Sequence, residues 1–238
     1  ADYVTIITMA VYDELKLLES ANSDKSLKVT IVSNPLVRDA LRTIRDEKTD
    51  MPAFRSAVYA LTPHLIYSAT SALKENKIIT KTPLANITTY ALLDKIVLIP
   101  VLRSGIGMHT PAQAIFPNAP TIFAGMARDE ATAIPHWYYD LKDLQYLDQG
   151  NNTVFLILDP MLATGGSAKE TIKRIKEIYP KGQIKMISLI AAPEGIKNLN
   201  QAHPDVEITT ASVDGHLNNH SYIVPGLGDA GDRQFGTT

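Results

Sequence analysis

"VFLILDPMLATGGSAKETI", residues 154–172, passes from a continuous apolar run through a glycine-containing turn into an amphipathic segment. The apolar run, 153–158, is typical of a strand that is buried on both faces. After the turn, alanine and isoleucine residues recur at helical spacing as far as residue 178. A second apolar run follows at 184–190. This order predicts a strand, a helix and a second, parallel strand joined by a right-handed crossover.

Further apolar runs extend the same pattern. They lie at 95–101, 121–126 and 206–213, and they predict additional strands. The fold class is therefore α/β, with a mainly parallel central sheet flanked by helices. Upstream, Asn34 and Pro35 form a plausible helix start, and a later apolar stripe contains Pro63, where we expect a kink or two joined helices.

The segment 127–152 does not fit a sheet. It is long, polar and aromatic, which favours either a functional flap or a poorly ordered excursion. Its aromatic residues, Trp137, Tyr138 and Tyr139, are more readily explained by packing within the flap than by stacking on a base. His136 is interpreted as a surface residue of the same segment.

Composition excludes several kinds of function. The 238 residues carry a net charge of −2, which provides no general field for nucleic acid or acidic membranes. The chain has no cysteine, so disulfides, thiolate catalysis and thiolate metal sites are excluded. Neither a membrane-spanning run nor a signal pattern is apparent, and we expect a cytoplasmic protein.

The turn after the first strand predicts an anion site. Glycines allow the backbone amides of 164–167 to converge, and the helix N-terminus adds partial positive charge. Asp159, at the carboxyl end of the strand, lies where open α/β sheets bind ligands. A carboxylate beside a phosphate cradle suits a ribose phosphate, and the missing Gly-Lys-Ser/Thr excludes a nucleoside-triphosphate P-loop. An ordinary glycine turn before a helix remains the alternative.

A second glycine cluster, Gly226-Leu-Gly228-Asp-Ala-Gly231, matches the dinucleotide fingerprint G-x-G-x-x-G. A dinucleotide site needs a helix, a second strand and an acid about 20 residues later, and only seven residues follow Gly231. The match is therefore a coincidence of spacing. We expect an irregular terminal loop with close backbone approach, or a simple turn cluster.

Four spaced stretches together resemble one family. "LILDPMLATGGSA" (156–168) resembles the 5-phosphoribosyl 1-diphosphate (PRPP) motif of the type I phosphoribosyltransferases, and its Asp159-Pro160 pair resembles the uracil phosphoribosyltransferase branch. "IPVLRSGIGM" (99–108), "IAAPEGI" (190–196) and "YIVPGLGDAGDRQFGT" (222–237) agree with that branch. The resemblance implies a single domain over 34–238, with a flap at about 127–152, a terminal base-binding loop at about 222–236, and an N-terminal arm over 1–33.

The resemblance also implies an activity and its residues. The chain would be a glycosyltransferase of pyrimidine salvage that joins uracil to PRPP and releases UMP and diphosphate. Arg128 and Asp229 would be catalytic. PRPP would be bound by Arg103, Arg128, Asp159, Pro160, Met161, Leu162, Ala163, Thr164, Gly165, Gly166, Ser167 and Asp229. The peptide between Leu102 and Arg103 would be cis.

Uracil would be recognised by the terminal loop. The backbone of Ile223, Gly228 and Ala230 would pair with the flat polar edge of the base, and Asp229 would face the ribose. Mg²⁺ would arrive bound to PRPP, since a single acid at 159 makes a poor direct metal site. The family implies a homodimer or higher homo-oligomer. Some relatives are activated by GTP in larger assemblies, and the sequence leaves that property open.

The alternative function is a regulatory protein of the same fold that binds PRPP or nucleotides. Such proteins usually need a basic surface for nucleic acid, and the charge balance gives no sign of one. We therefore expect small-molecule substrates, with neither nucleic acid nor membrane as a partner.

Overall fold

The computed structural model describes residues 27–128, 135–147, 150 and 152–237. The first 26 residues of the expected N-terminal arm lie outside the described residues. The strands are β1 (Val29–Ile31), β2 (Glu75–Lys81), β3 (Asn86–Leu92), β4 (Lys95–Leu102), β5 (Ala124–Arg128), β6 (Pro135–Tyr139), β7 (Thr153–Leu158), β8 (Met161–Leu162), β9 (Gln183–Ala191), β10 (Glu207–Val213), β11 (His216–Leu217) and β12 (Ile223–Val224). The helices are α2 (Pro35–Arg45), α3 (Met51–Ala69), α4 (Ile106–Ile115), the 3-10 helix η1 (Lys142–Tyr146), α5 (Gly166–Ile178), α6 (Pro193–Ala202) and α7 (Ala230–Phe235).

The central sheet confirms the expected fold class. Its order is β1-β10-β9-β7-β4-β5-β6, and β8 pairs with β9. Neighbouring strands are parallel except for β5 and β6, which are antiparallel. β7 and β9 are adjacent, with α5 between them in sequence, as the pattern around 154–172 predicts.

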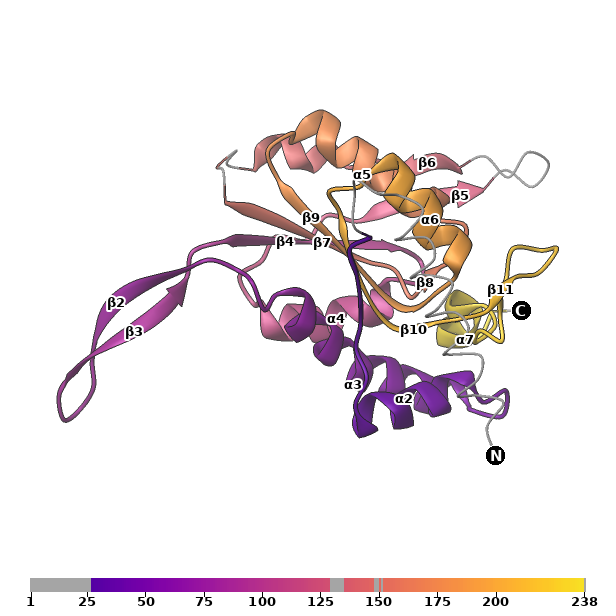
Figure 1. Ribbon diagram of the computed structural model, residues 1–238, viewed down its shortest axis with the longest axis horizontal. Coiled ribbons are helices and arrows are strands. Elements are labelled where there is room, and N and C mark those ends of the chain that lie inside the picture. Colours follow the sequence, from indigo (N-terminus) through magenta and orange to yellow (C-terminus); the bar gives the residue numbers. More distant parts are fainter. Residues whose placement is uncertain (1–26, 129–134, 148–149, 151, 238) are drawn as a thin grey trace.

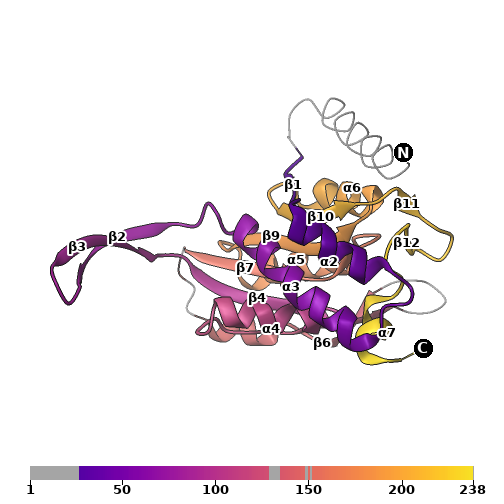
Figure 2. The ribbon, with the colours of Figure 1, turned by 90° about the horizontal axis from the view of Figure 1, so that it is seen from below.

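Two layers of helices cover the sheet. Helices α2, α3 and α4 lie on one face, and α5 and α6 lie on the other (Figures 1 and 2). All six residues of β7 are buried, because both faces of this central strand are covered. Because these strands are parallel, their carboxyl ends lie along the same edge of the sheet, where the loops that follow them meet.

The first two helices begin as local capping chemistry dictates. The Asn34 side chain accepts hydrogen bonds from the amides of Leu36 and Val37, both at 3.0 Å, and Asp50 caps α3 in the same way. Helix α3 continues through Pro63. Of the two expected alternatives, a kink or two joined helices, the second is therefore wrong, since burial of one face of α3 against the sheet offsets the missing backbone hydrogen bond.

Three segments differ from expectation. Strand β5 starts at Ala124, and Thr121 makes only an isolated bridge to Leu98. The segment 127–152 was expected to lie off the sheet, yet residues 135–139 form edge strand β6 because β5 offers them an unpaired backbone edge. Residues 29–31, expected in the arm, pair with β10 as an edge strand of the sheet.

The β2–β3 hairpin extends away from the body of the molecule (Figure 1). It leaves from the edge of the sheet where β4 begins, opposite the loops that follow the strands. Within the described residues, every helix is too short or too polar to cross a lipid bilayer.

Candidate functional site

The loop between β7 and α5 has the backbone features that the sequence predicts for an anion cradle. Gly165 precedes the helix with φ of +76°, and α5 has no side-chain cap, in contrast to α2 and α3. A Cβ at Gly165 would lie 2.8 Å from the carbonyl oxygen of Gly195. Glycine is therefore required at 165 for both conformation and space. The partly buried helix N-terminus, which lacks a side-chain cap, offers the amides and the dipole that would stabilise a phosphate.

Helix α6 holds this cradle from behind. Asn198 Nδ2 donates a hydrogen bond to the carbonyl oxygen of Thr164 at 2.8 Å. A Cβ at Gly195 would lie 2.3 Å from the carbonyl oxygen of Ala163, so α6 packs directly against the loop backbone. This contact gives the "IAAPEGI" stretch a structural role in supporting the cradle.

The loop between β4 and α4 lies beside the first. The peptide between Leu102 and Arg103 is cis, as expected. Ser104 Oγ donates a hydrogen bond to Asp159 Oδ1 at 3.3 Å, which joins the loops that follow β4 and β7. Gly105 allows close approach, because a Cβ there would lie 2.4 Å from the carbonyl oxygen of Leu158.

The Arg103 side chain lies over the C-terminal segment. Its Nη2 is 3.4 Å from Asp232 Oδ1 and 3.5 Å from Thr237 Oγ1, and the guanidinium lies 6.0 Å from the centre of the Phe235 ring. The Arg103 side chain is 56% exposed, so these contacts are weak and readily exchanged for an anion.

The terminal loop completes this edge of the sheet. Gly226 and Gly228 have φ of +63° and +79°, and the Val224–Pro225 peptide is cis. Ala230 then begins helix α7, so the expected irregular loop is in part helical. The reason is a local cap, in which Asp229 accepts a hydrogen bond from the amide of Asp232 at 2.9 Å.

Gln234 ties the terminal helix to the β4–α4 loop. Its buried Nε2 donates hydrogen bonds to the carbonyl oxygens of Ser104 at 3.0 Å and Ala230 at 2.9 Å. Its Oε1 is buried without a hydrogen-bond partner, and a Cβ at Gly107 would lie 1.7 Å from it. Together with the Ser104–Asp159 hydrogen bond, these contacts hold together three segments that are distant in sequence at the carboxyl edge of the sheet.

The flap region, 127–152, is anchored near its middle. Asp140, after β6, forms a two-point ion pair with Arg174 of α5, at 2.9 Å and 2.8 Å. The hydrogen bond from Arg174 lowers the pKa of Asp140 below its ordinary value. Trp137 packs partly buried against the core, as expected, whereas Tyr138 and Tyr139 are exposed.

Part of the flap and the side chain of Arg128 lie outside the described residues. Arg128 is the last residue of β5, and its side chain lies outside the described residues, as do residues 129–134, 148–149 and 151 of the flap. His136 is exposed on β6, as interpreted from the sequence. Among the described residues, no group of three or more histidine or acidic side chains could hold a metal ion.

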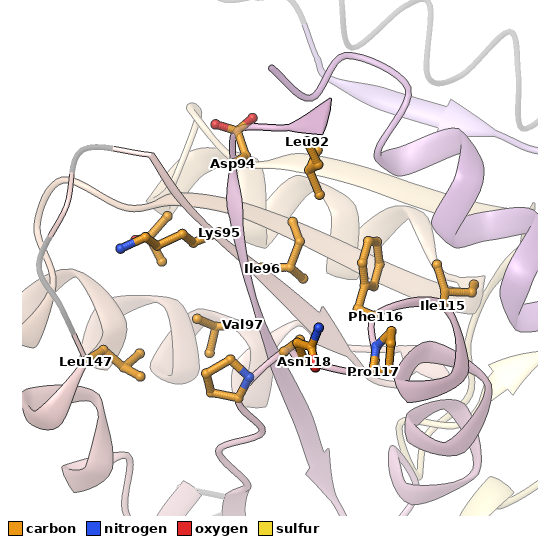
Figure 3. A pocket seen from close by; sticks show the side chains of 13 residues that line it. Leu92, Asp94, Lys95, Ile96, Val97, Ile115, Phe116, Pro117, Asn118 and Leu147 are labelled. Atoms are coloured by element: carbon orange, nitrogen blue, oxygen red, sulfur yellow. The ribbon is translucent and has the colours of Figure 1, made fainter. Parts of the chain in front are cut away.

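A separate cavity of about 470 Å³ lies at the opposite edge of the sheet (Figure 3). It is lined by the first residues of β4 and by Leu92, Phe116 and Leu147, among others. Residues 98–102 of β4 separate the last residue of the strand that lines this cavity, Val97, from Arg103, which corresponds to roughly 20 Å. The cavity is therefore distinct from the anion cradle.

Sequence reasoning missed the side chains that support the loops. They are Arg45, Asn198, Asp214, Arg233 and, as a positioning residue, Gln234. Arg45 and Asp214 are 169 positions apart, so no local pattern could have paired them.

Comparison with known proteins agrees with this geometry. A family model described as "Uracil phosphoribosyltransferase" matches residues 31–237. A uracil phosphoribosyltransferase from Malacoplasma penetrans is 44% identical over 87% of this chain and 98% of the relative. One from Roseiflexus sp. is 43% identical over 88% and 99%, respectively.

Solved structures show the same fold. The AQ2163 protein from Aquifex aeolicus has a TM-score of 0.80 at 33% identity, covering 88% of this chain and 99% of that one. An adenine phosphoribosyltransferase from Trypanosoma brucei has a TM-score of 0.52 at 8% identity, covering 82% and 87%, and shares the fold alone. Since the family model and relatives above 40% identity span nearly the whole described chain, this protein belongs to the uracil phosphoribosyltransferase family.

Proposed function

We propose that this chain transfers the 5-phosphoribosyl group from PRPP to N1 of uracil. The bond between the ribose anomeric carbon and diphosphate breaks, a bond from that carbon to N1 forms, and the N1 proton is released to water. The products are UMP and diphosphate. The observation that carries the proposal is the junction of two glycine loops and the terminal loop through Ser104, Asp159 and Gln234.

The two glycine loops are assigned to the two phosphorylated ends of PRPP. The backbone amides of 163–167 and the hydroxyls of Thr164 and Ser167 would hold the 5′-phosphate at the N-terminus of α5. Asp159, with its neighbours 160–162, would lie along the ribose and accept hydrogen bonds from its hydroxyls. Arg103 would leave its weak contacts with the C-terminal segment and bind the diphosphate.

Arg128 would stabilise the leaving diphosphate. It ends β5 next to the flap, so closure of the flap would bring positive charge to the developing anion and exclude water. Positioning and charge stabilisation would supply the rate enhancement, without a covalent intermediate.

The terminal loop is assigned to uracil. Backbone groups of Ile223, Gly228 and Ala230 would pair with the carbonyls and N–H of the base. Cytosine would leave buried protein groups unpaired and would be rejected for that reason. Asp229 would face the ribose or the waters of the metal.

Mg²⁺ is assigned to the substrate. Asp159 is followed by Pro160 rather than by a second acid, and the described residues contain no acidic cluster for a protein-held ion. The ion would therefore be carried by the diphosphate of PRPP, keep several of its waters, and neutralise the leaving group. GTP binding, found in some relatives, stays a hypothesis for this chain, as does a cytoplasmic location.

A homodimer or higher homo-oligomer would form through the β2–β3 hairpin. The hairpin exposes apolar side chains on both faces: Ile78, Ile79, Leu84, Ile87, Tyr90 and Leu92. A two-stranded hairpin is marginally stable by itself, and exposed apolar clusters are typical of interfaces. In a two-fold dimer the same surface would serve both copies.

A substrate panel tests the reaction. With PRPP and Mg²⁺, uracil should give UMP, while cytosine and hypoxanthine should give no nucleotide above background. Nucleotide formed from hypoxanthine but not from uracil would contradict the assignment of the terminal loop. The absence of any product would favour the regulatory alternative, which the comparisons do not favour.

A further inference from the structure

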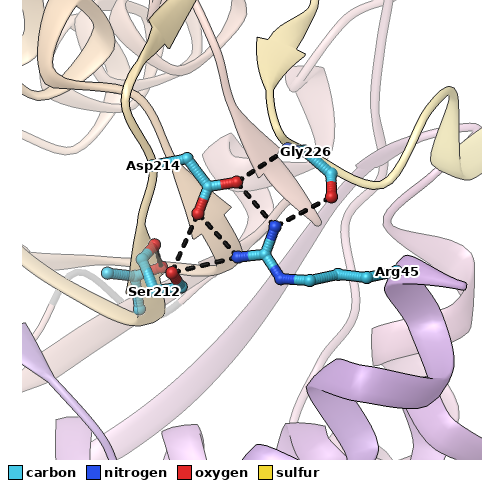
Figure 4. Close-up of polar contacts among 5 residues, drawn as sticks. Arg45, Ser212, Asp214 and Gly226 are labelled. Atoms are coloured by element: carbon cyan, nitrogen blue, oxygen red, sulfur yellow. Dashed lines mark hydrogen bonds and ion pairs between the residues drawn. The ribbon is translucent and has the colours of Figure 1, made fainter. Parts of the chain in front are cut away.

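The last residue of α2 reaches into the base of the terminal loop. Arg45 Nη1 donates hydrogen bonds to Asp214 Oδ2 at 2.7 Å and to the carbonyl oxygen of Gly226 at 2.8 Å (Figure 4). Its Nη2 donates to Asp214 Oδ1 at 2.6 Å and to Ser212 Oγ at 3.0 Å. One guanidinium thus connects α2, the segment after β10, and the terminal loop.

Gly226 is held at both of its backbone polar groups. Its carbonyl accepts from Arg45, and its amide donates to Asp214 Oδ2 at 2.9 Å. The conformation requires glycine, because φ is +63° and a Cβ would lie 2.0 Å from the carbonyl oxygen of Ile223. Gly226 lies between Ile223 and Gly228, the two residues proposed to begin uracil recognition. Its orientation therefore sets the direction of the peptides on either side.

Burial makes this arrangement specific. The Asp214 side chain is 2% exposed and the Arg45 side chain 25%. A buried carboxylate needs a partner that satisfies both oxygens, and the planar fork of arginine does so while leaving a donor for Gly226. Lysine cannot make these four contacts together.

A second arginine, Arg233, also binds this junction. Arg233 of α7 donates to the carbonyl oxygens of Ile44, of Asp46 at 2.6 Å and of Leu227 at 2.7 Å. The last turn of α2 is thereby bound to the loop at Gly226 through Arg45 and at Leu227 through Arg233.

We infer that Arg45 and Asp214 are positioning residues for the pyrimidine: they fix the Gly226 peptide and thereby set affinity and selectivity for uracil without contacting it. The inference rests on the proposed assignment of the terminal loop to the base. It predicts that α2, which carries none of the residues assigned to substrate, controls the KM for uracil separately from the KM for PRPP.

The first test replaces Arg45 with Gln. The KM for uracil should rise about tenfold or more, because the loop loses its fixed geometry, while the KM for PRPP should stay within about twofold. Arg42→Gln is the matched control, because Arg42 lies one turn earlier on α2, pairs with Asp39 alone among the acidic groups that the structure describes, and has a side chain that is 68% exposed. It should leave both constants unchanged.

A double variant separates positioning from stability. Arg45→Met with Asp214→Leu removes both charges, which should restore thermal stability lost in Arg45→Gln. The KM for uracil should remain raised, because neither side chain can hold Gly226. Recovery of a wild-type uracil KM together with stability would overturn the inference and leave the pair a structural role only. If Arg45→Gln does not fold, this double variant carries the test alone.

Gly228→Ala distinguishes a failure of the positioning role of Arg45 from a failure of the proposed base site. It strains a residue with φ of +79° inside the proposed base site. A raised uracil KM in Gly228→Ala with a normal one in folded Arg45→Gln would overturn the positioning role while leaving the base site in place. Normal uracil KM in both variants would instead refute the base site itself.

Discussion

Ser104 Oγ donates a hydrogen bond to Asp159 Oδ1 at 3.3 Å, across the ends of the neighbouring strands β4 and β7. The contact joins the loop proposed for diphosphate to the acid proposed for ribose. It is also part of a longer connection, because the carbonyl of Ser104 accepts from Gln234 of α7. The three proposed subsites therefore share one hydrogen-bonded framework.

Asp159→Asn should impair PRPP use. The amide keeps the size of the side chain but loses the charge that accepts from ribose hydroxyls, so kcat/KM for PRPP should fall by roughly ten- to a hundredfold. Initial rates at varied PRPP concentration measure this. Ser104→Ala, which removes only the tether to Asp159, should cost less than about tenfold. Equal kcat/KM for Asp159→Asn and wild type would contradict the ribose assignment.

Gly165→Ala should damage the phosphate cradle. Alanine at φ of +76° is strained, and its Cβ would collide with the Gly195 carbonyl oxygen. We expect a loss of about 1–3 kcal/mol in stability and a raised KM for PRPP. Gly150→Ala is a matched control, because a Cβ at Gly150 would meet nothing within 4 Å. Thermal unfolding and PRPP titration are measured for both variants. Equal melting temperatures and equal KM values for PRPP in Gly165→Ala and Gly150→Ala would contradict the assignment.

Arg128→Ala should lower turnover more than it weakens uracil binding. Loss of one charge that stabilises the leaving group should reduce kcat by roughly a hundredfold. The KM for uracil should change little, since the base is assigned to the opposite end of the site. Steady-state kinetics at saturating PRPP measure the difference, and normal turnover would refute the role of Arg128.

The Asp140–Arg174 ion pair predicts a pH-dependent stability. Because the pKa of Asp140 is lowered by Arg174, the pair stabilises the fold fully above the ordinary carboxyl pKa of about 3.9. This contribution disappears as the pH falls through the lowered pKa of the folded state. Asp140→Asn should therefore unfold about 2–4 °C lower at pH 7, with the difference vanishing in acid.

The control for this pair is Glu177→Gln. Glu177 also contacts Arg174, at 3.3 Å, but is 49% exposed, so its loss should change the melting temperature by less. A difference between Asp140→Asn and wild type that persists unchanged down to pH 2 would contradict the electrostatic explanation.

Ile79→Lys should weaken self-association. Ile79 is 72% exposed on the hairpin, and a buried lysine in a dimer interface would be costly. Sedimentation should show a shift toward monomer, while Leu36→Lys, on an exposed position of α2, should leave the oligomer unchanged. A wild-type chain that is monomeric at micromolar concentration would exclude the proposed dimer.

The sequence predicts the buried strands well and the exposed ones poorly. β7 is a continuous apolar run after Thr153, and β9 is apolar apart from Gln183, Lys185 and Ser188, so the requirement for burial on both faces is visible locally. In β2, Ile78 and Ile79 are adjacent and point to opposite faces, which erases the alternation expected of a strand. β6 depends on the backbone edge of β5, which is a tertiary feature that a local pattern does not record.

Residues of the candidate site also differ in whether the sequence predicts them. Gly165 and Asp159 are predictable because a strand, a turn and a helix are contiguous around them. Arg45 is not predictable, because its partners Asp214 and Gly226 are 169 and 181 positions away. Charged residues at a helix end usually face solvent or interact with the helix dipole. Only the tertiary structure distinguishes Arg45 from Arg42.

The separation between Arg45 and its partners has a consequence for the order of folding. The two loops assigned to PRPP are joined across 55 residues by the Ser104–Asp159 contact, whereas the pyrimidine slot requires closure of a loop of more than 160 residues. Since non-local closure is slow, we expect PRPP-binding competence to appear before uracil-binding competence during refolding. A newly made molecule would then pass through a stage in which it can hold the sugar donor but not yet recognise the acceptor.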